Sequence, residues 1–251
     1  MVLMLWIAPG MMNAQEMTGK EIMEKVYYRD EGDDREGNLT MTLINSRGDK
    51  RVRELRQFYK DFGSTDKKIM FFLSPADVRN TSFMNWSYDD ESKDDDQWIY
   101  LPALSKVKRI SGDSKSDYFM GSDFTYDDLG ERHPNEDHHK LLRTEEVNGV
   151  NCYVVESTPK DPDYIYSRSV SWVIPDKWIG LKKKFYDEDG EFLKTLEVKE
   201  YDRVGDVWII LESVMENVQK DHKTRMNYQD VRINTGIPER YFTERMMMRG
   251  L

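Results

Sequence analysis

The side chains in this sequence that could do chemistry are mainly carboxylates. The loop from Asp89 to Asp96 holds six acidic residues, and calcium prefers clusters of carboxylate oxygens. The spacing lacks the central glycine and the closing glutamate of an EF-hand loop. A solvated hairpin loop is therefore the favoured interpretation, and a cation site there is the alternative that the sequence leaves open.

Adjacent residues of one type also argue against a catalytic or metal site. His138 and His139 point to different faces of any regular element, so they cannot chelate one ion as an i, i+4 pair could. Asp127 and Asp128 diverge for the same reason. Cys152, the only cysteine, is expected to be a small core residue. No nucleophile stands beside a base and no glycine run could bind phosphate. We expect no enzyme, no metal and no cofactor.

The stretch from Gln97 to Leu129 differs from these acidic segments, because it is rich in aromatic and other apolar residues that could form a contact surface. Trp98 and Tyr100 share one side of an extended segment, and a short strand should end at Pro102, which cannot donate to a further ladder. A basic piece and a polar loop follow, and then an aromatic segment begins at Tyr118. The pattern indicates a surface for apolar contacts rather than a catalytic motif.

This stretch resembles the periplasmic outer-membrane lipoprotein-sorting family, which has the LolA-like fold. The resemblance rests on the tryptophan-bearing strand that ends in Leu101-Pro102, on Lys108-Arg109-Ile110, and on the run Phe119-Met120-Gly121-Ser122-Asp123-Phe124-Thr125-Tyr126-Asp127-Asp128-Leu129. It extends from about Met17 to Thr243. It implies an incomplete, strongly curved β-barrel with helices over its mouth, enclosing an apolar cavity for lipid-like cargo. The partners implied are lipid or lipoprotein acyl chains, with an inner-membrane exporter and an outer-membrane acceptor as further candidates.

Length and composition fit a single hollow domain. The chain has 251 residues, of which 38% are hydrophobic, 33% charged and 12% aromatic. It contains no linker rich in glycine, serine or proline, so residues 16–251 are predicted to form one LolA-like domain with a thin core. The net charge of −10 argues against nucleic acid as a partner and against docking on anionic lipid by charge alone.

Residues 1–15 are interpreted as the remnant of a signal peptide. Val2 to Ala8 form a short apolar run, and Met12-Asn13-Ala14 resembles a small-residue cleavage site, although the basic n-region is missing. A disordered leader is the alternative. The sequence has no run of about 18 apolar residues that could span a bilayer. We therefore expect cleavage near Ala14 and a soluble periplasmic protein.

The elements that would position the aromatic segment can be predicted from local patterns. Thr18 and Glu21 form a capping box before an amphipathic helix. From Asn38 to Ile233 apolar and polar residues alternate, with turn signals roughly every ten to fifteen residues. The pattern predicts a mainly β protein with one strongly curved antiparallel sheet of roughly ten or eleven strands, forming an open barrel. A few helices should cover its concave side, with the helix from Thr18 and the segment near Phe119 to Leu129 against it. A short terminal helix is expected near Ile237 to Glu244.

A carrier of apolar cargo needs large apolar residues on the inward face of such a sheet. The sequence does not say which strand face is inward, and each candidate could equally be core beneath a helix. The candidates are Ile69, Phe71, Leu73, Trp98, Tyr100, Phe119, Met120, Phe124, Val170, Trp172, Ile174, Leu181 and Phe185.

Two functions follow from these expectations. The first is a periplasmic carrier that binds lipid or lipoprotein acyl chains for transport or sorting towards the outer membrane. The alternative is a non-enzymatic accessory or binding module of an envelope exporter of the RND type. In the carrier, the segment that follows the polar loop Ser111 to Ser116 could close the mouth when the cavity is empty, with Gly112 and Gly121 as hinges. A fixed flap that is simply part of the core is the alternative.

Overall fold

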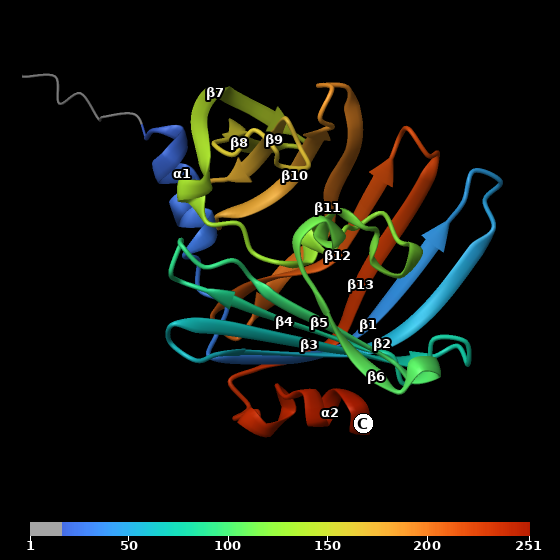
Figure 1. Cartoon of the computed structure of the whole chain (residues 1–251). Coiled ribbons are helices and arrows are strands. Elements are labelled where there is room, and N and C mark those ends of the chain that lie inside the picture. The colour runs from blue at the N-terminus through green and yellow to red at the C-terminus, as the bar shows by residue number, and fades with distance from the viewer. Residues whose placement is uncertain (1–16) are drawn as a thin grey trace, which may run out of the picture.

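Alternating residues build one thirteen-stranded antiparallel sheet in the computed structural model, which describes residues 17–251 (Figure 1). The strand order is β6-β5-β4-β3-β2-β1-β13-β12-β11-β10-β9-β8-β7. The strands are β1 (Asp34–Ile44), β2 (Lys50–Asp61), β3 (Thr65–Ser74), β4 (Ser82–Tyr88), β5 (Asp96–Leu101), β6 (Lys106–Ile110), β7 (Asp137–Val147), β8 (Val150–Pro159), β9 (Arg168–Ile174), β10 (Ile179–Tyr186), β11 (Phe192–Val204), β12 (Val207–Asn217) and β13 (His222–Ile233).

The predicted fold class is confirmed, but the predicted number of strands was too low. β6 and β7 are the two edges of the sheet, and in the described residues they are not paired with each other, so the barrel stays open. Both edge strands carry mostly polar, exposed side chains. Edge strands often carry such side chains. Because these two strands show little alternation of apolar and polar residues, the sequence pattern did not reveal them.

The predicted N-terminal helix is α1 (Gly19–Tyr27), and its capping box is confirmed. The Thr18 amide donates to Glu21 Oε2 at 2.7 Å, and the Glu21 amide donates to Thr18 Oγ1 at 3.2 Å. Glycine at position 19 is needed because a Cβ there would lie 2.7 Å from the backbone nitrogen of Leu141 in β7. Ile22 is fully buried in a cluster with strands β8 and β9. The helix therefore lies tightly against one end of the sheet.

The C-terminal segment lies on the other face of the sheet, which corrects the expectation that the helices cover the concave side. A 3₁₀ turn, η6 (Glu239–Tyr241), leads into α2 (Glu244–Arg249). Phe242 and Met247 are buried against Phe58 and Phe71. Figure 1 shows α2 outside the sheet, on the side away from the long connection between β6 and β7. The sheet therefore has apolar residues on both faces at this end.

Asp34 joins the first strand to the end of the last one. Its buried carboxylate accepts hydrogen bonds from the backbone amides of residues 235–237 at 2.8 to 2.9 Å. Burial raises the pKa of Asp34, but the amide hydrogen bonds outweigh this effect and lower the pKa below its usual value. The negative charge of Asp34 thus holds the C-terminal segment in place.

We expect Asp34→Ala to lower the free energy of unfolding by at least about 2 kcal/mol, because three amide donors lose their charged partner. Since the folded pKa is depressed, the contribution of Asp34 is fully present above the unfolded pKa of about 3.9 and is lost as pH falls through the lower folded value. Urea unfolding at neutral and acid pH measures both effects. A variant as stable as the parent at neutral pH would contradict this role.

Candidate functional site

The long connection between β6 and β7 places an aromatic loop on the concave face of the sheet (Figure 1). We call residues 117–129 the flap. Phe119 is fully buried, and its ring centroid lies 5.2 Å from that of Phe83 and 5.9 Å from that of Phe72. Phe124 is buried in the same cluster, which also holds Leu39 and Met226 from the middle of the sheet. The flap thus fills one half of the concave side, as the sequence predicted for this segment.

Buried polar contacts fix the flap at its C-terminal side. Lys194 is fully buried and forms an ion pair with Asp128. Its ammonium group also donates to the backbone oxygen of Asp123 at 3.0 Å. The Tyr166 hydroxyl donates to the other oxygen of Asp128 at 2.9 Å. The flap is therefore held by charge as well as by apolar packing.

A second set of polar contacts holds the tip of the flap. Thr224 of β13 donates to the buried Asp123 carboxylate at 2.7 Å, and His222 Nδ1 lies 2.7 Å from the same oxygen. Arg53 donates to the backbone oxygen of Met120 at 2.6 Å. Met120 and Gly121 both have positive φ, 50° and 74°, and a positive φ is strained for methionine. The tip is a tight turn held from two strands.

The other half of the concave side is a polar cavity of about 670 Å³, which we call the polar chamber. Its wall includes the last residues before β1 and inward side chains of β1, β2, β3 and β13. Glu31 pairs with Arg29 and with Arg35, whose Nη2 lies 3.2 Å from Glu31 Oε2. Burial raises the pKa of Glu31, but the two arginines outweigh it and lower the pKa to about 2. Glu31 is therefore a permanent anion already neutralised by protein.

Two further carboxyl groups of the polar chamber behave in the opposite way. Burial raises the pKa of Asp66 to about 6, although its carboxylate accepts a hydrogen bond from Tyr59 at 2.9 Å. Burial raises the pKa of Glu131 to about 7, against the opposing effect of Lys68. In residues 17–251, the Glu131 carboxylate has neither a hydrogen bond nor an ion pair. The chamber thus contains acids that lack a cationic partner.

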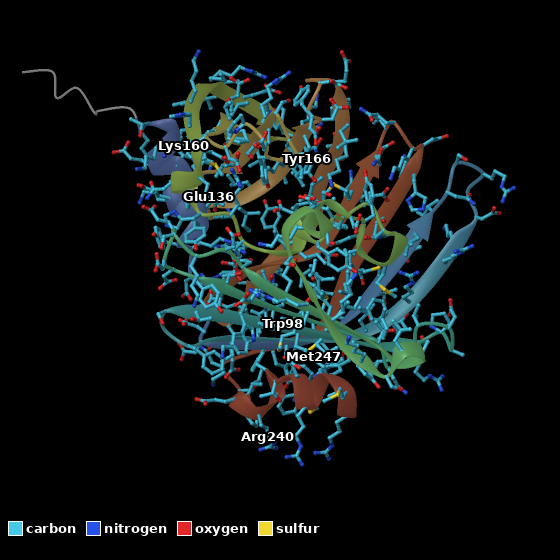
Figure 2. All side chains as sticks on the ribbon, viewed as in Figure 1. Trp98, Glu136, Lys160, Tyr166, Arg240 and Met247 are labelled. Atoms are coloured by element: carbon cyan, nitrogen blue, oxygen red, sulfur yellow. The ribbon has the colours of Figure 1, made fainter. Side chains whose placement is uncertain are left out.

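The structure separates the thirteen residues predicted to line one cavity. Four of them, Phe119, Met120, Phe124 and Phe185, belong to the cluster on the concave side. Four others pack beneath the C-terminal segment on the outer face: Ile69, Phe71, Trp98 and Tyr100. Figure 2 shows Trp98 and Met247 at this layer. Leu73 is 42% exposed at the end of β3. The common cavity expected from the sequence is therefore not present in this arrangement.

The remaining four residues form a separate cluster over β8 to β11: Val170, Trp172, Ile174 and Leu181. Phe185 pairs in register with Ser169, so it shares a face with Ser169 and not with Val170. That register places Val170, Trp172 and Ile174 on the face opposite Phe185. Apolar residues in this part of the sheet are buried on both faces, and alternation alone cannot tell the two faces apart.

Sequence reasoning missed the polar chamber, although the strands contain a signal for it. Along β1, Arg35 is in phase with the buried Leu39, and along β2, Gln57 is in phase with the buried Leu55. Lys68 of β3 is likewise in phase with Met70. Three adjoining strands therefore change from apolar to polar on the same face. That change predicts a hollow with polar walls at one end.

Within residues 17–251, no group of three or more histidine, cysteine, aspartate or glutamate side chains is arranged to hold a metal ion. No helix in the same range is both long and apolar enough to cross a membrane. The predicted signal peptide and its cleavage site near Ala14 lie outside the described residues.

Comparison with known proteins places this arrangement among solved structures. A family model described only as uncharacterized-protein-like matches residues 64–249. A DUF1329 family protein from Desulfovibrio piger is 30% identical, with a TM-score of 0.86 over 91% of this chain and 97% of that one. A domain assigned as an outer membrane lipoprotein-sorting protein from Vibrio parahaemolyticus is 36% identical, with a TM-score of 0.86 over 92% of this chain and 98% of that one.

A more distant structure shares the fold. A LolA superfamily protein from Nitrosomonas europaea is 20% identical, with a TM-score of 0.69 over 92% of this chain and 100% of that one. Among curated proteins none matches the chain significantly. The two relatives at 30% and 36% identity are covered almost completely. The chain therefore belongs to the family of these two relatives, a DUF1329 protein and an outer membrane lipoprotein-sorting protein, and it has the LolA-like fold.

Proposed function

We propose that this protein is a periplasmic carrier that binds the acyl chains of lipids or lipoproteins on its concave side, in the place that the flap fills here. The proposed contacts are the apolar residues of that cluster on the sheet, Phe185 among them, and Phe119, Met120 and Phe124 are the flap side chains that the acyl chain would replace. An inner-membrane exporter and an outer-membrane acceptor are the partners that such a carrier needs. The family membership and the geometry of the flap support the proposal.

One observation carries the proposal. In the described residues, the backbone hydrogen bonds of the flap to other backbone groups stay within the flap or reach only the adjoining Ser114 and Gly130, as in Phe119 N to Phe124 O at 2.7 Å and Tyr126 N to Asp117 O at 3.0 Å. The flap meets the sheet through side chains, so it could move away as a unit without breaking a strand ladder. It would leave behind an apolar surface of aromatic and aliphatic residues.

The energy available from that surface is sufficient for a carrier. Burial of each methylene stabilises by about 0.8 kcal/mol, so a long acyl chain of about fifteen methylenes gives about 12 kcal/mol before ordering costs. Displacing the flap uses part of this energy, because the aromatic rings of the flap lose their own burial. An affinity near micromolar is the expected result, which is suitable for a carrier that must also release its cargo.

A reversible lock on the flap tests this proposal. Asp123 and Thr224 have side-chain oxygens 2.7 Å apart, so cysteines at both positions in a Cys152→Ser background should form a disulfide. We expect saturable binding of a fluorescent fatty acid to the reduced protein and little binding to the oxidised protein. Unlabelled lipid should displace the probe. The Asp123→Cys single variant controls for loss of the polar contact.

Two results would count against the carrier. Equal binding in the oxidised and reduced states would mean that cargo does not enter beneath the flap. A flat titration of the reduced protein well above micromolar concentration would favour the accessory module of an envelope exporter instead.

A further inference from the structure

In the polar chamber, most cationic side chains already pair with a carboxylate, whereas some carboxyl groups of the described residues have no cationic partner. Both arginines near its floor, Arg29 and Arg35, are engaged by Glu31. Arg132 pairs with Glu136 and Asp137, which do not line the chamber. Apart from the exposed Asp30, Asp33, Asp61 and Asp89, what remains is one lysine, Lys68, which has no ion pair in residues 17–251, beside the carboxyl groups of Asp66 and Glu131. The chamber therefore favours a ligand that brings positive charge.

Aromatic rings line the same wall. Tyr27, Tyr59 and Tyr228 all border the chamber, and the faces of aromatic rings attract ammonium groups. The Tyr59 ring already receives a cation, since the Arg35 guanidinium lies 5.1 Å from its centroid. Carboxylates and tyrosines together are the chemistry with which proteins bind ammonium ions. An anion alone would meet uncompensated acids here.

An unsatisfied acceptor nearby indicates a missing hydrogen-bond donor. Gln97 is fully buried, and its side chain borders a recess that shares Tyr27, Glu131 and Arg132 with the chamber. The Gln97 Nε2 donates to Asn85 Oδ1 and to Tyr126 O, both at 2.8 Å, which fixes the orientation of the amide. Its Oε1 has no hydrogen-bond partner in residues 17–251. A buried acceptor without a donor is costly.

The chamber also adjoins the apolar half of the concave side. Tyr228 borders the chamber and packs against the cluster that contains the flap. Its hydroxyl donates to Gln57 Oε1 at 3.2 Å, so this hydrogen-bonded pair lies at the boundary between the two halves. A ligand whose head occupies the chamber could extend an apolar tail into the place of the flap.

We propose that the polar chamber binds the zwitterionic phosphoethanolamine group, with its ammonium against Glu131 and Asp66 and its phosphate against Lys68. This inference rests on the proposed function, because in a lipid carrier the group is the head of an aminophospholipid. It names a lipid class and not only an acyl chain. The same chemistry is offered by free phosphoethanolamine, and the experiment separates the two sources.

The test uses the full chain and short-chain lipids below their micelle concentrations, with binding measured by calorimetry. Dihexanoyl phosphatidylethanolamine should bind at least about tenfold more tightly than dihexanoyl phosphatidylglycerol, because only the former supplies a charge-assisted ammonium contact. Glu131→Gln should abolish this preference while leaving the circular dichroism spectrum unchanged. Glu200→Gln, at an exposed position outside the chamber, is the matched control and should keep the preference.

The remaining outcomes are also decisive. Free phosphoethanolamine that binds as tightly as the lipid would identify the free amine as the ligand and would overturn the lipid source. Equal binding of the two lipids, or an unchanged preference in Glu131→Gln, would overturn the assignment of the chamber. Fatty-acid binding beneath the flap with no head-group preference would overturn only this inference. Phosphoethanolamine binding without acyl binding would overturn only the proposal that the protein carries acyl chains.

Acid should weaken the preference as well. The pKa of Asp66 is about 6 and that of Glu131 about 7, so both carboxyl groups become neutral as pH falls from about 8 to about 5. The charged groups that act on Glu131 are Lys68 and Asp66 of β3, Glu31 before β1, and Asp95 before β5. A preference for the ethanolamine lipid that stays constant over this range would contradict a carboxylate contact.

Discussion

Truncation of Phe119 to alanine should lower the free energy of unfolding by about 3–5 kcal/mol, as large-to-small changes at fully buried aromatic positions do. The ring has no exposed surface and touches Phe72, Phe83 and Tyr126. Urea unfolding with an unchanged m-value measures the loss. Phe192→Ala, at a partly exposed position on β11, is the control and should cost less.

The same variant separates a movable flap from a fixed one. If cargo displaces the flap, a flap that packs less well competes less strongly, so Phe119→Ala should bind a fluorescent fatty acid more tightly than the parent. A fixed flap predicts no gain in affinity. A stability loss below about 1 kcal/mol would contradict the packing described for this ring.

Replacement of Lys194 should have an effect of similar size through a different mechanism. Lys194 is fully buried and Asp128 almost so, and removal of one partner of a buried ion pair costs about 3–5 kcal/mol because the other charge stays without compensation. Lys194→Met keeps most of the side-chain volume, so its loss of stability reports the charge and not a cavity. Thermal and urea unfolding measure it.

A second substitution should partly restore this loss. In Lys194→Met/Asp128→Asn the carboxylate is replaced by a neutral amide whose oxygen can still accept from the Thr125 amide, while its NH₂ group can donate to the Tyr166 hydroxyl. We expect the double variant to be more stable than Lys194→Met alone. A Lys194→Met protein as stable as the parent would show that the ion pair does not hold the flap.

The parts of the fold that depend on neighbouring residues could be predicted from the sequence. The capping box of Thr18 and Glu21 is a local signal, and so is Gly48, whose φ of 83° serves the turn between β1 and β2. The antiparallel meander follows from alternation and turns. The placement of the aromatic segment on the concave side came from its resemblance to a known family.

The lining of the concave side could not be predicted, because it depends on residues far apart in the chain. Ile69 and Met70 are both buried. Only the C-terminal segment, with Phe242 and Met247, decides that Ile69 faces outward. Nothing near Ile69 in the sequence carries that information. The polar chamber was missed for a related reason, since Arg35, Gln57 and Lys68 become neighbours only when three strands align.

The pairing of the first strand with the last has a consequence for how this protein folds. β1 and β13 lie in the middle of the sheet, with Met41 opposite Met226. Every other strand pair joins neighbours in the sequence, so each half of the sheet can form from local hairpins. The central pair closes the longest loop and has to wait until β13 has been synthesised. The concave side therefore cannot be enclosed before β13 is present, and a nascent chain remains an open row of hairpins until then.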